Sequence, residues 1–232
     1  MQRQQAHKMS STGQFAEHEL VFMMGEELKK PLTAIKILSE NNDKQSIIAL
    51  EARRALRTID NVLFYQQLSS DQTALDLTPV HVGSTITDVA SELQPLSIIR
   101  GCETEVFIQS GIATVDADRD LLKSGLESLW QAVLTMTQRP SPLSWHVTKT
   151  SKGIRIVVLN NSIDLSKLTM SSLSSKARIS RQPMSGSAGP ATDLLAAYGM
   201  FELLGAKLKK VKQDKGSGLG VTLPISKQLT LV

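Results

Sequence analysis

Residues 24–35, which read MGEELKKPLTAI, place a proline in the middle of an amphipathic helix. The helical pattern runs from about Phe15 to Ser39, and its apolar residues recur at spacings of three and four, which winds them onto one stripe. These residues are Val21, Met24, Leu28, Leu32, Ile35 and Leu38. An interior proline removes one helical hydrogen bond and usually kinks the helix, so Pro31 calls for a structural or functional reason.

A second helix is expected after the break at residues 41–43, and it runs to about Leu68. Its apolar residues alternate in steps of four and three. They are Ile48, Ala52, Ala55, Ile59 and Val62. Two helices with one apolar stripe each predict a hairpin over residues 15–70, and two copies bury their stripes together as a four-helix bundle. We therefore expect a homodimer; the alternative is packing inside one larger helical domain. The polar residues 1–14 are expected to form a flexible tail.

The pattern changes after residue 70. Short strand-like runs now alternate with helical windows, which predicts a two-layer α/β sandwich over residues 75–232. The strand-like runs are Leu75–Val82, Glu103–Gln109, Ser144–Thr150, Ile154–Leu159, Lys207–Lys212 and Leu219–Leu223, and the helical windows are Ser84–Ile99, Arg119–Met136 and Thr192–Leu204. Residues 164–190 are rich in serine and glycine and are expected to form a lid loop. Hairpin and sandwich together give an α+β fold class.

Composition argues against several kinds of function. The net charge of +4 is spread along the chain and aromatic residues make up only 4%, so we expect no nucleic-acid partner. One cysteine and four histidines argue against a structural zinc site, and no metal centre is expected. No stretch approaches the roughly 20 uninterrupted apolar residues of a membrane helix, so we expect no membrane segment and a cytoplasmic location.

The segment around Pro31 resembles the H-box of two-component sensor histidine kinases, whose usual form reads SHELRTPLTAI. Seven positions match, namely Glu27, Leu28, Pro31, Leu32, Thr33, Ala34 and Ile35. The resemblance implies a dimerisation hairpin kinked at the proline, followed by an ATP-binding domain of the histidine-kinase ATPase type. This is the organisation that the periodicity predicts, from residue 15 onward.

The departure from that family is Glu26, which stands where the phosphoacceptor histidine is expected. An imidazole nitrogen attacks a γ-phosphorus near physiological pH, whereas a carboxylate is repelled by the triphosphate. The resemblance makes Glu27 the general base, now with no histidine to deprotonate, and Lys30 stands where phosphatase activity favours threonine or asparagine. Autophosphorylation is therefore predicted to be lost. His18 lies eight residues before Glu26 with no proline at the right distance, so we interpret it as an exposed side chain.

The stretch from Asp118 to Thr137 resembles the N-box helix of the same family and aligns with it without gaps. In that register the two asparagines of the motif fall on Ser128 and Ala132. The resemblance implies that the second position holds the magnesium ion that bridges the nucleotide phosphates, and alanine offers no ligand atom. A one-residue shift would place Gln131 there instead, at the cost of the ungapped match.

The adenine motif of the family, D-x-G-x-G, aligns with residues 160–164 after a predicted strand. Asn160 takes the place of the aspartate that binds the adenine amino group, and its amide oxygen could still accept that hydrogen bond. Ser162 and Asp164 replace the two glycines. The resemblance therefore implies a weakened nucleotide site at these three residues.

The last family motif, G-x-G-x-G-L, opens the final helix and aligns with residues 189–194. Gly189 is retained, but Asp193 stands at the third glycine and, with Thr192, is predicted to form the helix N-cap. Phosphates bind such a helix start through its free N–H groups, and this carboxylate would occupy those donors itself. The glycine-rich residues 216–220 are predicted to be a hairpin turn rather than a second phosphate loop.

These features predict a degenerate sensor histidine kinase core, a pseudokinase that acts in signal transduction by binding a response-regulator receiver domain or a partner kinase. No cofactor is expected, and ATP with magnesium is the alternative. Lys29, Lys30 and Lys36 are candidates for contacting the acidic pocket of a receiver, unless they form a solvated helix face. Two alternatives are a diverged but active ATP-dependent protein-histidine kinase and a phosphotransferase on the same fold. The latter keeps the histidine, so Glu26 counts against it.

Overall fold

The structure is a computed structural model of the chain, and it describes residues 75–163, 165, 168, 189–214 and 216–226. Isolated positions nearer the N-terminus are also described, namely 28, 31–35, 37, 38, 48, 52, 55, 56, 59 and 60. All of these isolated positions are helical. Most of the predicted tail, hairpin and lid loop therefore lies outside the described residues, and their boundaries stay predictions.

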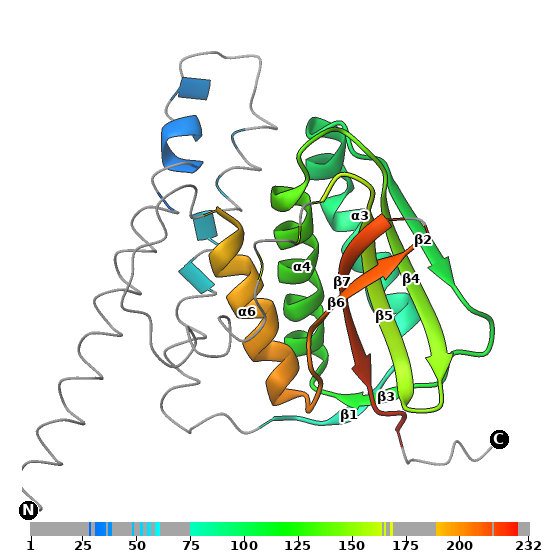
Figure 1. Ribbon diagram of the computed structural model, residues 1–232. Helices are drawn as coiled ribbons and strands as arrows, with labels where there is room; N and C mark the ends of the chain where they lie inside the picture. The colour runs from blue at the N-terminus through cyan, green and yellow to red at the C-terminus, as the bar shows by residue number, and fades with distance from the viewer. Residues whose placement is uncertain are drawn as a thin grey trace, which may run out of the picture.

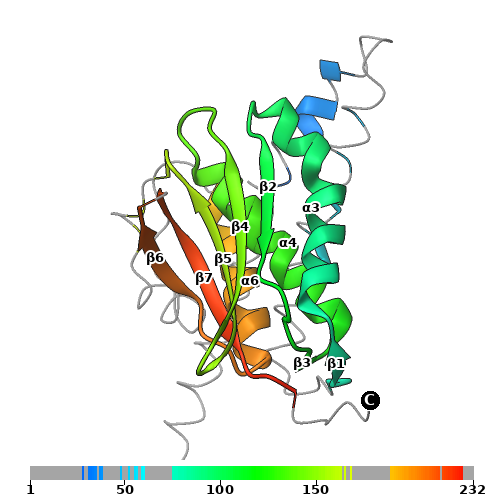
Figure 2. The ribbon, with the colours of Figure 1, turned by 90° about the vertical axis from the view of Figure 1, so that its right-hand side faces the viewer.

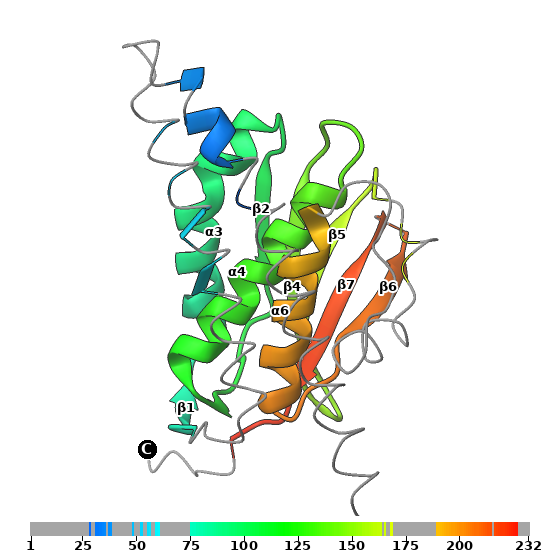
Figure 3. The ribbon, with the colours of Figure 1, turned by 90° about the vertical axis from the view of Figure 1, so that its left-hand side faces the viewer.

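Within the described residues, helices and a mixed sheet form two layers (Figure 1). Helices α3, α4 and α6 lie side by side over one face of the sheet, as Figure 3 shows from the helix side. The helices are α3 (Val82–Ile99), α4 (Arg119–Met136) and α6 (Gly189–Leu203). The strands are β1 (Thr78–Val80), β2 (Thr104–Ile108), β3 (Val115–Ala117), β4 (Leu143–Thr150), β5 (Gly153–Asn160), β6 (Lys209–Gln213) and β7 (Gly216–Leu223). The predicted α/β sandwich is confirmed.

The five-stranded sheet has the order β2-β4-β5-β7-β6. Strands β2 and β4 pair in parallel, and the remaining neighbours pair antiparallel. A separate two-stranded sheet joins β1 to β3 at one end of the molecule (Figure 1). The parallel β2–β4 pair needs a crossover connection, and α4 supplies it on the face that the other helices also cover.

Side-chain caps fix where two of the helices begin. The carboxylate of Asp118 accepts a hydrogen bond from the Leu121 amide at 3.0 Å, so α4 starts at Arg119 as the sequence predicts. Its second oxygen accepts the Asp76 amide at 3.2 Å and ties the chain before β1 to the same helix end. Helix α3 is capped by His81, whose Nδ1 accepts the Ser84 amide at 3.2 Å.

The main core lies between the helices and the sheet. Trp130 of α4 stacks on Trp145 of β4 with ring centroids 5.3 Å apart, and both side chains are fully buried. Helices α4 and α6 approach closely, because a Cβ atom added at Gly125 would lie 3.4 Å from side-chain atoms of Met200 and Phe201. Burial of such large apolar side chains supplies most of the stabilisation, about 1.5–3 kcal/mol for each.

The glycine-rich residues 216–220 are not a hairpin turn, and that prediction is wrong. They form the first half of β7, whose neighbours are β5 and β6. A Cβ atom at Gly218 would collide with the Val158 carbonyl oxygen, and one at Gly220 would lie 3.0 Å from side-chain atoms of Val157 and Val211. These glycines allow close approach of neighbouring strands, a role that glycine also has inside sheets.

Apolar side chains remain exposed on the described part of the N-terminal helices. Leu32 is 54% exposed, Ile37 62% and Leu56 60%, whereas Ala55 is buried. No helix within the described ranges combines the length and apolar character needed to cross a membrane.

Candidate nucleotide site

The two N-box positions lie in the middle of α4, on the side that meets α6. Ser128 is 1% exposed and Ala132 is fully buried. Residues three, four and seven apart share one face of a helix, so both positions lie on the face of Gly125, which approaches Met200 and Phe201. The position of the expected magnesium ligand thus carries a methyl group against a neighbouring helix.

Asn160 ends β5 and has an exposed fraction of only 1%. Its Nδ2 donates to the Ser141 hydroxyl at 2.8 Å, to the Ser141 carbonyl oxygen at 3.2 Å and to the Pro142 carbonyl oxygen at 3.1 Å. Carbonyl oxygens only accept hydrogen bonds, so these partners fix which end of the amide is the nitrogen.

The amide oxygen of Asn160 is occupied as well. It accepts the Ser162 amide at 2.8 Å and contacts the Ser162 hydroxyl at 3.0 Å. This oxygen is the atom that the resemblance predicts as the acceptor for the adenine amino group. In the structure both ends of the Asn160 amide bind other parts of the same chain.

We call Ser141, Asn160 and Ser162 the β5 clasp, because they join the loop after α4 to the turn after β5. The Ser162 hydroxyl donates to the Arg139 carbonyl oxygen at 2.8 Å, and it lies 3.2 Å from the Ser141 hydroxyl. The Gln138 amide donates to the Ser162 carbonyl oxygen at 3.3 Å. Ser141 belongs to no family motif, so the sequence offers no signal for its part in the clasp.

Solved structures show which fold this arrangement belongs to. Histidine kinase AdeS of Acinetobacter baumannii has a TM-score of 0.58 and 12% identity, over 86% of this chain and 98% of that one. The catalytic domain of histidine kinase ThkA has a TM-score of 0.55 and 15% identity, over 65% of this chain and 97% of that one. The chain has the histidine kinase fold. No protein-family model matches the sequence, and no curated protein matches it either.

A third structure extends the comparison beyond the catalytic domain. Histidine kinase ThkA in complex with response regulator protein TrrA has a TM-score of 0.62 and 15% identity, over 97% of this chain and 65% of that kinase chain. The α+β fold class and the histidine-kinase ATPase type of the sandwich are thus confirmed. At this level of identity the likeness concerns the fold alone.

Within the histidine kinase fold, Asp193 has a different place from the one predicted. Helix α6 begins at Gly189, so Asp193 is its fifth residue and the N-cap prediction is wrong. Pro190 explains the earlier start, because proline is favoured in the first turn of a helix, where its missing N–H is not needed. Asp193 is 9% exposed, so a carboxylate lies in a buried position of α6.

Several predicted site residues lie outside the described residues. They are Glu26, Glu27, Lys29, Lys30, Lys36 and Asp164. His18 is outside as well, and at Gly189 the structure describes only the backbone. Among the described side chains, no group of three histidine, cysteine, aspartate or glutamate residues could hold a metal ion.

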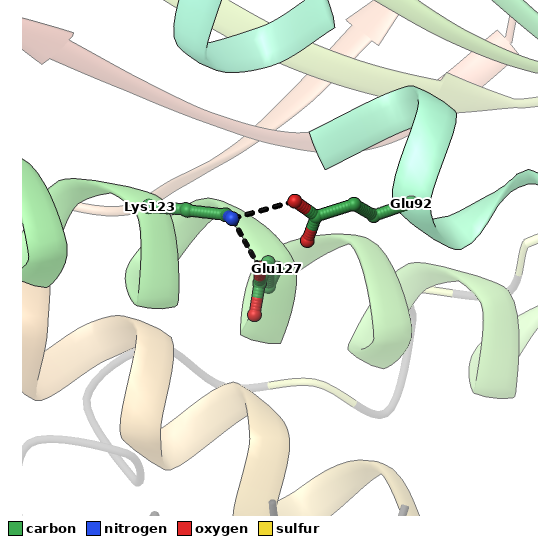
Figure 4. Close-up of polar contacts among 3 residues, drawn as sticks. All are labelled: Glu92, Lys123 and Glu127. Atoms are coloured by element: carbon green, nitrogen blue, oxygen red, sulfur yellow. Dashed lines mark hydrogen bonds and ion pairs between the residues drawn. The ribbon is translucent and has the colours of Figure 1, made fainter. Parts of the chain in front are cut away.

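A charged contact links α3 to α4 on the surface (Figure 4). Lys123 Nζ lies 2.6 Å from Glu92 Oε1 and 4.0 Å from Glu127 Oε1. The hydrogen bond to Glu92 raises the pKa of Lys123 against a smaller opposing effect of burial, and the charges of Glu92, Glu127 and Asp88 raise it further. The contact links α4 to α3, which lies on the other side of α4 from α6.

Proposed function

We propose that this chain is the core of a degenerate sensor histidine kinase in two-component signalling, a pseudokinase that acts by binding other proteins. The observation that carries the proposal is the Asn160 amide, which binds the protein itself at both ends. Adenine recognition at this position needs a free acceptor. A nucleotide would have to break the β5 clasp, at about 0.5–1.5 kcal/mol for each hydrogen bond that is not replaced.

Two further positions support the same proposal. The buried Ala132 offers no oxygen to a magnesium ion. Glu26 stands at the predicted phosphoacceptor position. Its carboxylate cannot replace an imidazole that takes up a phosphoryl group and passes it to a receiver. We therefore expect no bound cofactor and no autophosphorylation.

Nucleotide binding is tested by calorimetry and by thermal unfolding with magnesium and ATP at millimolar concentration. We expect no heat of binding and no shift in melting temperature. A ligand at 100 times its Kd stabilises a protein by about 2.7 kcal/mol, so specific binding would be plain. Such a shift, absent with AMP at the same concentration, would contradict the proposal and favour the diverged, active kinase.

The proposed partners are a second copy of the chain, through residues 15–70, and a response-regulator receiver domain or a partner histidine kinase. The structure of ThkA in complex with TrrA supports a response regulator as partner. Lys29, Lys30 and Lys36 are the proposed contact residues. Complementary charge at an interface mainly raises the association rate and the specificity.

Receiver binding is tested by pull-down with purified receiver domains. We expect the double variant Lys29→Glu/Lys30→Glu to lose binding at low salt. The matched control is Lys152→Glu in the exposed turn between β4 and β5, which should bind as the wild type does. Equal binding by all three proteins would remove the lysines from the proposal.

A further inference from the structure

Among the residues that the structure describes, strand β2 has a partner strand on one side only. It pairs in parallel with β4 and stands at the end of the strand order (Figure 2). The Glu103 carbonyl oxygen accepts the Leu143 amide at 2.8 Å, and the Gln109 amide donates to the Val147 carbonyl oxygen at 3.0 Å. Backbone groups alternate in direction along a strand, so odd-numbered residues of β2 face β4 and even-numbered residues face the free edge.

The outward backbone groups of β2 belong to Thr104, Val106 and Ile108. No backbone partner for them exists in the ranges that the structure describes. A row of unpaired N–H and C=O groups is a template on which another extended chain can add. The backbone of β2 therefore offers a place for one more strand.

The side chains at this edge are exposed and partly apolar. Phe107 is 44% exposed and Ile108 39%, while Ile98 and Ile99 at the end of the neighbouring α3 are 64% and 55% exposed. Helix α3 runs alongside β2 (Figure 2). Glu103 and Glu105 are exposed at the same edge and make it acidic, although the chain as a whole carries a net charge of +4.

The opposite edge of the sheet is different. Strand β6 carries Lys209, Lys210 and Lys212, all exposed. Lysines on an edge strand are a common protection against the addition of a further strand. The chain thus protects one edge of its sheet with lysine and leaves the other edge acidic, partly apolar and free of proline.

We propose that β2 is a docking strand for an extended, basic segment of a partner protein, which adds to the sheet beside it. Main-chain hydrogen bonds to Val106 and Ile108 would supply affinity, as in other cases of strand addition. Lysine or arginine side chains of the segment would face Glu103 and Glu105, and its apolar side chains would contact Phe107. The proposal goes beyond the pseudokinase function and does not depend on the nucleotide position.

The first test uses a fluorescein-labelled peptide of alternating lysine and valine, seven residues long, and fluorescence anisotropy with the full chain. We expect the variant Glu103→Lys/Glu105→Lys to bind at least ten-fold more weakly at low salt, because two attractive charges become repulsive. The matched control, Lys209→Glu/Lys212→Glu, changes the far edge and should bind as the wild type does. Tighter binding by this control, which lowers the net charge of the chain, would overturn the proposal if the gain matches the loss in Glu103→Lys/Glu105→Lys, because it indicates a general charge effect.

The second test separates strand addition from surface attraction. The variant Val106→Pro removes an N–H that faces the free edge and spares the ladder to β4, so it should fold and lose the peptide. Its melting temperature should fall, because the partly buried Val106 side chain packs against the core. A second measurement does not depend on this variant: amide hydrogen exchange of the wild-type protein with and without the peptide. Peptide should protect the amides of Val106 and Ile108, with no change at Glu105 and Phe107. Peptide binding without protection of these two amides would overturn the proposal. Protection that appears without peptide when the protein concentration is raised would also overturn it, because the strand edge would then pair with a second copy of the chain.

Discussion

Asn160 binds its own chain at the position where the resemblance to histidine kinases predicts a ligand-binding aspartate. An aspartate at position 160 would place a carboxylate against the carbonyl oxygens of Ser141 and Pro142 and remove the donor they now share. We expect Asn160→Asp to lower the free energy of unfolding by about 2–4 kcal/mol, the cost of an unsatisfied buried group. Ser162→Ala, which removes one hydroxyl from the β5 clasp, should cost about 1 kcal/mol. Urea unfolding at neutral pH measures both, and an unchanged midpoint for Asn160→Asp would contradict the clasp.

A buried hydroxyl on β2 leads to the opposite expectation. Thr104 Oγ1 is buried and has no hydrogen-bond partner among the described residues. Valine has nearly the same shape, so Thr104→Val should raise the free energy of unfolding by about 1 kcal/mol. Thr135→Val is the matched control, because the Thr135 hydroxyl donates to the Gln131 carbonyl oxygen at 2.8 Å and its loss should be neutral or destabilising. Thermal unfolding distinguishes the two, and destabilisation by Thr104→Val would indicate a hidden partner.

At the scale of elements, the sequence predicts long helices well and short or glycine-rich strands poorly. The bounds of α4 agree with the prediction, because Asp118 caps a helix whose apolar residues keep a regular spacing. Strand β3 has three residues, Val115–Ala117, which is too short for an alternating pattern to register. The glycines of β7 indicate a turn by local rules, and the close approach of β5 and β6 explains them.

The contact between α3 and α4 gives a prediction about pH. Lys123 and Glu92 are 37% and 51% exposed, so solvent screening keeps the pair weak, and Lys123→Met should cost about 0.2–1 kcal/mol at neutral pH. The pKa of Lys123 is raised from its ordinary value of 10.5 in the folded protein. A raised pKa means that the stabilisation is complete below the unfolded value and is lost as the pH rises through the folded value.

The measurement is urea unfolding of wild type and Lys123→Met from pH 7 to above pH 10.5. We expect a constant difference between the two proteins up to about pH 10 and a shrinking one above it. Lys152→Met, at an exposed turn, is the control and should match the wild type throughout. A difference that persists unchanged at the alkaline end would assign the effect to packing of the lysine stem.

At the scale of the whole molecule, the sequence predicts which elements carry Ser128, Ala132 and Asn160, but it does not predict the contacts of Asn160. Ser128 and Ala132 lie on α4, and Asn160 ends β5, as the motifs predict. The β5 clasp was beyond sequence reasoning, because its hydrogen bonds join residues 19 and 23 positions apart, through a loop that no motif covers. Local patterns predict elements, whereas contacts between distant loops depend on how the layers pack.

The last prediction concerns the predicted homodimer. Leu32 belongs to the predicted stripe of the first helix, and Leu56 follows Ala55 at the border of the second stripe. The two leucines are 54% and 60% exposed, and a second copy of the chain would cover such side chains. We expect sedimentation velocity to show a dimer for the wild type and monomers for Leu32→Lys and Leu56→Lys. Leu77→Lys is the matched control, because Leu77 is 56% exposed but lies outside the hairpin, and this variant should remain dimeric. The melting temperature of the α/β sandwich should stay the same in all three variants. A monomeric wild type at tens of micromolar, or a dimer that survives both hairpin substitutions, would show that these leucines serve another contact.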